Sequence, residues 1–155
     1  MRAVPRRRTS EWTLYVVAGS CALHVAEEYL TGWQEWARQT LGIDMPTTRF
    51  LLGNAVLVIV AVAFARMGWR RPALSLLIPS LALVNAVFFH ILPTIVQHRV
   101  SPGIYTAVLL YVPLSSWALV GAARDGVPRR AIATALAAGC LMMGGIVLGA
   151  RSLGS

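Results

Sequence analysis

Five long apolar runs, separated by short polar segments, dominate the pattern along the chain. Each run comes close to the ~20 residues that a helix needs to cross a hydrocarbon core of about 30 Å. The pattern therefore predicts an all-α, polytopic membrane helical bundle of about five transmembrane helices, folded as a single integral-membrane domain over residues 1–155. The predicted spans cover 12–31, 49–67, 73–97, 103–123 and 130–150.

Two polar segments flank the first run. Residues 1–11 form a basic tail, and 32–48, with the sequence GWQEWARQTLGIDMPTT, carry two tryptophans. Tryptophan is enriched where membrane and water meet. Segment 32–48 is therefore predicted to be an outer loop or a short interfacial helix.

Charge gives the predicted orientation. The 155 residues are 57% hydrophobic and 13% charged, and all 14 basic residues are arginines. Ten arginines fall on the side of the N-terminal tail and four on the other side. Because positive charge stays on the cytoplasmic side, we expect a cytoplasmic N-terminus and a multi-pass protein of the inner cell membrane. This clustering between apolar runs explains the net charge of +8 without any role in nucleic-acid binding.

The fifth run is rich in glycine. Gly145 and Gly149 are four residues apart, a spacing that lets helices approach closely. Packing within the bundle is the favoured interpretation, and a homodimer contact through this helix is the alternative.

Polar side chains interrupt four of the runs at a similar depth. Consecutive helices cross in alternating directions, so these residues all fall in the outer part of the bilayer, His24 and His90 each at ~12 Å from the outer end of their helix. We therefore predict a polar pocket near the outer leaflet. The residues concerned are His24, Glu27, Glu28, Asn54, Asn85, His90, His98 at the interface, and Tyr111.

Spacing suggests a chemistry for the first three. His24, Glu27 and Glu28 share one helix face, because positions three and four apart are neighbours on a helix. Such a set can bind one metal ion or share one proton. Asn85 and His90 are five apart, ~140° on a regular helix, so either Asn85 faces another neighbour or Pro93 kinks the helix and brings it round.

Structural roles compete with these functional ones. Asn54 and Asn85 suit interhelical hydrogen bonds, worth ~0.6 kcal/mol each. Core packing is the favoured role for Tyr111, and Glu27 and Glu28 have the alternative of extending toward the headgroups. Charged groups inside a membrane nevertheless usually face the bundle interior and mark function.

The segment HVAEE, from His24 to Glu28, together with NAVFFH at 85–90 and SPG at 101–103, resembles the HXXEE family of small bacterial integral membrane proteins. The resemblance covers most of the chain. It implies a membrane enzyme with a site at His24, Glu27, Glu28, Asn85 and His90, and it supplies no reaction.

These observations predict a metal-dependent enzyme that acts on a lipid-like or apolar substrate. The substrate would arrive from the bilayer, and membrane lipids would be partners of the protein. His24, Glu28 and His90 would be ligands, Glu27 a further ligand or general base, and His98 a fourth ligand. This donor set suits zinc, for a hydrolase, or iron, for an oxidoreductase. The alternatives are a metal-free acid–base isomerase or cyclase of a sterol- or terpenoid-like lipid, and a proton or metal-ion transporter.

Overall fold

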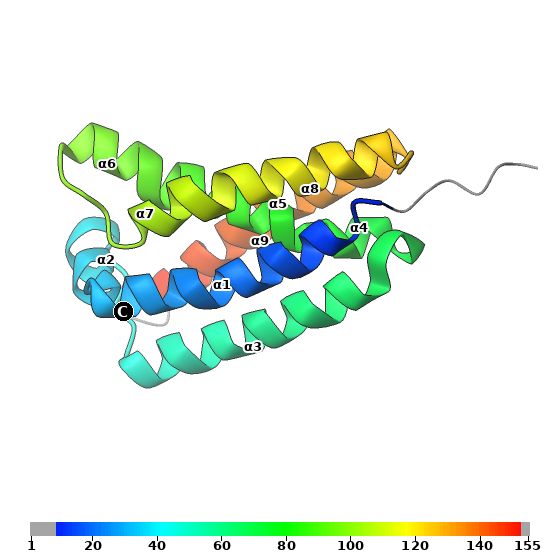
Figure 1. Ribbon diagram of the computed structural model, residues 1–155. Helices are drawn as coiled ribbons and strands as arrows, with labels where there is room; N and C mark the ends of the chain where they lie inside the picture. The colour runs from blue at the N-terminus through cyan, green and yellow to red at the C-terminus, as the bar shows by residue number, and fades with distance from the viewer. Residues whose placement is uncertain (1–8, 153–155) are drawn as a thin grey trace, which may run out of the picture.

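The computed structural model describes residues 9–152, which fold into one bundle of helices and contain no strand (Figure 1). The all-helical fold is confirmed. Residues 1–8 of the predicted basic tail lie outside the described residues. Three elements of the bundle are single long helices: α1 (Trp12–Leu30), α3 (Thr47–Met67) and α9 (Arg129–Ser152).

Two further segments of membrane-spanning length each consist of several consecutive helices, one of which is a π-helix. The first, Pro72–Gln97, comprises α4 (Pro72–Ser75), α5 (Leu77–Asn85), the π-helix η2 (Ala86–Ile91) and α6 (Leu92–Gln97). The second, Ile104–Arg124, comprises α7 (Ile104–Thr106), the π-helix η3 (Ala107–Tyr111) and α8 (Val112–Arg124). A short 3-10 helix, η1 (Gly68–Arg70), links α3 to α4.

Segment 32–48 contains the short helix α2 (Trp33–Leu41). Gly32 and Gly42 flank it with φ of 81° and 65°, and Trp33 stacks on Phe50 of α3. Its position at a membrane interface remains a prediction.

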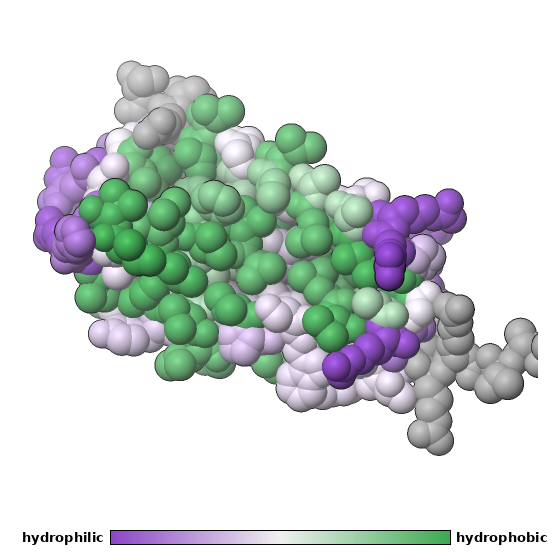
Figure 2. Space-filling model, turned by 90° about the horizontal axis from the view of Figure 1, so that it is seen from above, coloured by the Kyte–Doolittle hydropathy of each residue, from purple (hydrophilic) through white to green (hydrophobic). Residues whose placement is uncertain are grey.

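Four helices are long and apolar enough to cross a membrane: Thr47–Arg70, Pro72–Gln97, Ile104–Arg124 and Arg129–Gly149. Figure 2 shows a broad apolar belt on the bundle surface, with hydrophilic residues at its two ends. Helix α1 has a similar length, but His24, Glu27 and Glu28 make it more polar. Its crossing of a membrane, like the cytoplasmic N-terminus, stays a prediction.

Packing around α1 defines the core. This helix lies against α3, α5 and α8, and buries Leu14 and Val17 next to Leu76 and Ala118. These apolar side chains pack closely against one another. In a membrane, such packing contacts matter more than the hydrophobic effect, because lipid tails are themselves apolar.

Helix α9 approaches α5 most closely at one glycine in its first half. A Cβ added at Gly139 would lie 3.0 Å from the Cβ of Ser80 on α5, so glycine permits this approach. Gly145 and Gly149, predicted to pack within the bundle, would each place a Cβ where nothing lies within 4 Å. Among the described residues the close packing within the bundle that was predicted for these two glycines is therefore not seen. The homodimer alternative remains a prediction.

A carboxylate ties the chain together at the end of the bundle where α1 begins, here called the opposite end. Asp125, after α8, accepts hydrogen bonds from the Ser10 backbone amide at 2.8 Å, the Thr9 hydroxyl at 3.0 Å and the Trp69 indole at 2.9 Å. Burial would raise the pKa of Asp125, but the hydrogen bonds from Trp69, Ser10 and Thr9 outweigh it and lower the pKa. Asp125 therefore holds the start of α1 to the α3–α4 connection.

We expect Asp125→Ala to destabilise the protein by about 1 kcal/mol, since three donors lose their shared acceptor. The melting temperature in detergent, followed by tryptophan fluorescence, should fall by ~2–4 °C. Because the folded-state pKa is lowered, the stabilisation is present above the pKa of an unfolded aspartate, ~3.9, and is lost as pH falls through the folded-state value. Asp44→Ala, at an exposed position, is the control; equal shifts in both variants would contradict the assignment.

Candidate functional site: a buried His–Glu–His cluster

Three buried side chains meet at the other end of the bundle, here called the site end. His24 and Glu28 project from one face of α1, and His90 comes from the π-helix η2. The Nε2 atoms of His24 and His90 each lie 3.5 Å from Oε1 of Glu28. The three residues are only 2%, 0% and 6% exposed for His24, His90 and Glu28. Their ligand atoms all lie within 4.8 Å of one another, the only such group of three or more found among the described residues.

A threonine holds His24 from the far side of its ring. The Nδ1 atom of His24 is 2.7 Å from the Thr106 hydroxyl, which also donates to the carbonyl of Gly103. Since the hydroxyl has one proton, donation to Gly103 makes it the acceptor for an N–H on Nδ1. In the tautomer with the proton on Nδ1, which this network allows, the lone pair of Nε2 faces Glu28.

A serine hydroxyl contacts the Nδ1 atom of His90 in the same way. The Ser101 hydroxyl is 3.2 Å from Nδ1 of His90, and it also donates to the carbonyl of Phe89 at 3.2 Å. That carbonyl is free because Pro93, four residues later, has no amide hydrogen to offer it. In the tautomer with the proton on Nδ1, both histidines present a bare Nε2 to the same carboxylate oxygen, and neither Nε2 has a hydrogen-bond partner in the described chain.

The SPG segment closes the cluster from one side. Gly103 has φ of 90°, and a Cβ added there would lie 2.7 Å from His90 Cε1, 2.9 Å from Glu28 Cγ and 3.0 Å from His24 Cε1. Only glycine allows the backbone both this conformation and this approach. The three residues of the cluster are therefore held in place by the loop as well as by their helices.

Glu27 points away from the cluster and holds a different element. Its two carboxylate oxygens accept hydrogen bonds from the backbone amides of Tyr105, at 3.1 Å, and Thr106, at 2.7 Å. These amides begin α7, where helix N–H groups have no partner inside the helix and attract negative charge. Glu27 thus positions Thr106, the residue that orients His24.

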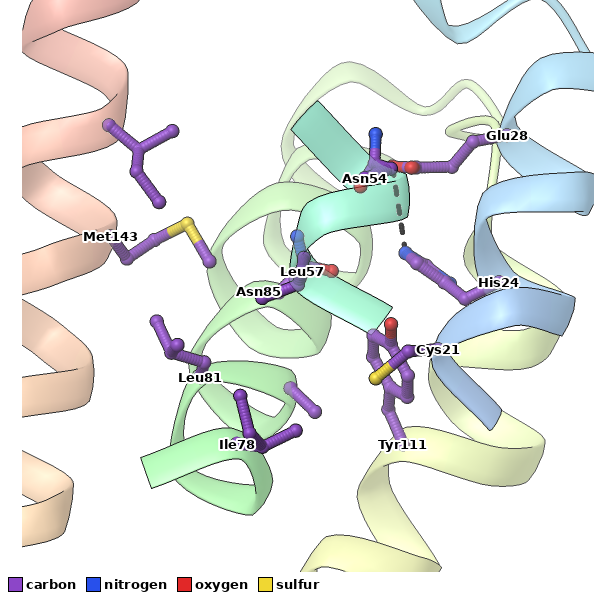
Figure 3. A pocket seen from close by; sticks show the side chains of 12 residues that line it. Cys21, His24, Glu28, Asn54, Leu57, Ile78, Leu81, Asn85, Tyr111 and Met143 are labelled. Atoms are coloured by element: carbon purple, nitrogen blue, oxygen red, sulfur yellow. Dashed lines mark ion pairs between the residues drawn. The ribbon is translucent and has the colours of Figure 1, made fainter. Parts of the chain in front are cut away.

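The π-helix η2 determines how Asn85 and His90 lie relative to each other, which the sequence left open. A π-helix has i→i+5 hydrogen bonds, so residues five apart come onto one face. Asn85 precedes η2 and His90 lies in it, and Asn85 lines the same pocket as His24 and Glu28 (Figure 3). The Oδ1 atom of Asn85 is buried and has no hydrogen-bond partner in the described chain.

Other predicted residues have mixed outcomes. Asn54 lines the pocket and donates to the Phe50 carbonyl of its own helix. Tyr111 is buried in the second π-helix, with its ring centroid 4.3 Å from that of His24. His98 is exposed at the end of α6, outside the cluster.

Sequence reasoning missed Ser101, Thr106 and the role of Gly103. A signal for the π-helices was present, since η2 and η3 each end two residues before a proline, Pro93 and Pro113. Single-turn π segments often occur at functional sites.

The fold and the cluster together define an α-helical protein with membrane-spanning capacity and a buried His–Glu–His cluster at one end. The chain belongs to the HXXEE family, whose model, described as "Protein of unknown function with HXXEE motif", matches residues 15–118. The match includes every residue of the cluster and its supports, and ends before α9.

A relative in Bacillus subtilis (strain 168), the uncharacterized protein YrkK, is 32% identical over 115 residues. The alignment covers 66% of this chain and 72% of YrkK. The search of solved structures found no match.

We expect Glu27→Ala to loosen the start of α7. The amide hydrogens of Tyr105 and Thr106 should exchange faster by roughly fivefold, the effect of losing a helix cap worth ~1 kcal/mol. Hydrogen exchange read by mass spectrometry tests this, and Glu27→Gln, which keeps one acceptor, should give an intermediate rate. Glu35→Ala, at an exposed position of α2, is the control; unchanged exchange in Glu27→Ala would rule out the capping role.

Gly103→Ala should be clearly more destabilising than Gly32→Ala. Both glycines have positive φ, so both substitutions cost ~1 kcal/mol of backbone strain. Only at Gly103 would the new Cβ also collide with buried side chains, whereas nothing lies within 4 Å at Gly32. Melting temperatures of the two variants measure the difference, and similar values would show that the loop does not press on the cluster.

Proposed function

We propose that the protein is a membrane-embedded, metal-dependent enzyme that acts on a lipid-like or apolar substrate in the outer half of the bilayer. His24, Glu28 and His90 are its metal ligands. The observation that carries the proposal is the convergence of two buried, unpartnered histidine nitrogens on one carboxylate oxygen.

The distances within the cluster support a metal site. Ligand atoms about 2.0–2.2 Å from a tetrahedral zinc lie about 3.3–3.6 Å apart. The two N–O separations of 3.5 Å fall within that range. Without a cation, two buried nitrogen lone pairs facing a carboxylate would be costly, because buried polar groups normally have partners.

The supporting hydrogen bonds have the form seen around metal-binding histidines. Such a histidine usually donates its second ring N–H to a protein oxygen, which fixes the tautomer and the ring orientation. With the proton on Nδ1, the Thr106 hydroxyl would be this accepting oxygen for His24 and the Ser101 hydroxyl would be it for His90.

Two histidines and one carboxylate leave coordination positions open, as catalytic sites do. Zinc there would supply a hydroxide nucleophile for a hydrolase, and iron would supply oxidation chemistry. The chain's own contribution is to orient the ligands, to exclude water by burial, and to offer Tyr111 and Asn85 to a bound substrate.

Glu27 and His98 receive other roles in this proposal. Both oxygens of Glu27 accept backbone hydrogen bonds, so it acts as a positioning residue and not as a ligand or base. His98 is exposed and stays outside the ligand set.

An enzyme accounts for the core better than a transporter does. Between the cluster and the opposite end the buried side chains are mostly apolar, and the hydroxyls of Ser20, Ser75 and Ser80 donate to backbone carbonyls. A path for ions would need polar groups through this region.

Metal content tests the proposal. The protein is purified in detergent without a metal-affinity step, and zinc and iron are determined per chain. We expect stoichiometric metal in the wild type, and loss in Glu28→Ala and His90→Ala. His98→Ala is the matched control, because the chain has three histidines and this one lies outside the cluster.

A second readout covers variants that fold poorly. Added zinc should raise the melting temperature of the metal-stripped wild type and of His98→Ala, because a ligand that binds the folded state stabilises it. Glu28→Ala should show no rise. A wild type that neither retains nor rebinds zinc or iron would overturn the proposal and favour acid–base chemistry by Glu28.

A further inference from the structure

An apolar groove lies on the bundle surface between α5–η2 and the second half of α9. It measures about 430 Å³ and is lined by Val84, Phe88 and Phe89 on one side and by α9 residues such as Gly144 and Leu148 on the other. This size falls within the range of small-molecule sites, about 300–1,000 Å³. The side chains of Phe88 and Leu148 are largely exposed on the bundle surface.

The groove adjoins the candidate site. Phe89, Met143 and Val147 line both the groove and a deeper cavity, and that cavity is also lined by Glu28 and Asn85. In Figure 3, Met143 on α9 faces Asn85 across the pocket that contains His24 and Glu28. Met143 is a flexible side chain at this boundary, suited to adapt to a ligand.

The inner cavities are small. They measure about 150 Å³ beside Trp33 and Phe50, and about 70 Å³ beside His24. One water needs about 10–15 Å³ of this measure, so the part beside His24 has room for a few waters or one small headgroup. The long part of a ligand must therefore lie in the groove.

Charge and hydrogen bonding define that headgroup. Among the residues that the structure describes, none that lines the groove or the two cavities is an arginine, so none of them offers a phosphate a cationic partner. The unpartnered Oδ1 of Asn85 is a buried acceptor and requires a donor. A hydroxyl supplies a donor without charge.

We propose that the substrate is a long-chain lipid alcohol that enters sideways from the bilayer through the groove between α5–η2 and α9. Its hydroxyl donates to Asn85 next to the His–Glu–His cluster, and its chain lies against Phe88, Phe89 and α9. This inference names the substrate class of the site and rests on the proposed function.

Photolabelling of the protein in lipid nanodiscs tests the proposal. The probe is hexadecan-1-ol with a mid-chain diazirine and a terminal alkyne, compared with the matching hexadecanoic acid and hexadecyl phosphate probes. We expect the alcohol to label residues 84–89 and 139–148 and to be displaced by unlabelled hexadecan-1-ol. Labelling by the phosphate should be weaker by roughly tenfold, the effect of burying a charge without a partner.

Two variants of adjacent glycines separate the groove from general lipid contact. Gly144 lines the groove and Gly145 does not, and a Cβ at either position meets nothing within 4 Å. Gly144→Trp should therefore abolish labelling by filling the groove, whereas Gly145→Trp should preserve it. Asn85→Leu should reduce the preference for alcohol over acid by roughly threefold to tenfold, since one hydrogen bond is lost.

Metal binding measured on the same samples keeps the two proposals apart. Gly144→Trp should retain the zinc-induced rise in melting temperature. Labelling that depends on Gly144 and Asn85 in a protein that binds no metal would leave this inference standing and overturn the metal site. Equal labelling by all three probes, or labelling unaffected by Gly144→Trp, would overturn this inference whatever the metal content.

Discussion

The burial of the Glu28 carboxyl group between two imidazoles is the constraint on which the site end depends. A carboxylate away from water is costly unless other groups compensate it. In the proposed site a bound cation would offset this cost, and nearby elements build its surroundings: α1 supplies His24, a π-helix supplies His90, and the loop before α7 comes so close that a Cβ at Gly103 would meet all three side chains. The SPG segment, the π-helix and the HXXEE motif can therefore be understood as parts of one arrangement.

The motif itself divides into two roles. His24 and Glu28, four residues apart, face inward, while Glu27 is turned toward the start of α7. Two adjacent acids in a helix thus serve opposite sides of it, one facing the cluster and the other the backbone that supports the cluster. This separation also keeps the two carboxyl groups from competing for the same partner.

Much of the fold follows from the sequence because hydropathy is a local property. The helices begin and end within a few residues of the predicted runs, and His24 and Glu28 are brought together by helical spacing alone. The pairing with His90 followed from comparing depths in neighbouring helices. Ser101 and Thr106 could not be found this way, because their contacts depend on how the loop folds back. The π-helix also required the structure, since a regular helix would have turned Asn85 away from His90.

Helix α1 and the α7–α8 segment are joined at both ends by reciprocal contacts. Asp125, directly after α8, accepts a hydrogen bond from the backbone amide just before α1. Glu27, near the end of α1, accepts hydrogen bonds from the backbone amides that begin α7. Each segment therefore supplies the carboxylate that accepts hydrogen bonds from the start of the other. Neither segment can slide or rotate without breaking hydrogen bonds at both ends. The pair forms a rigid frame that includes two of the three cluster residues.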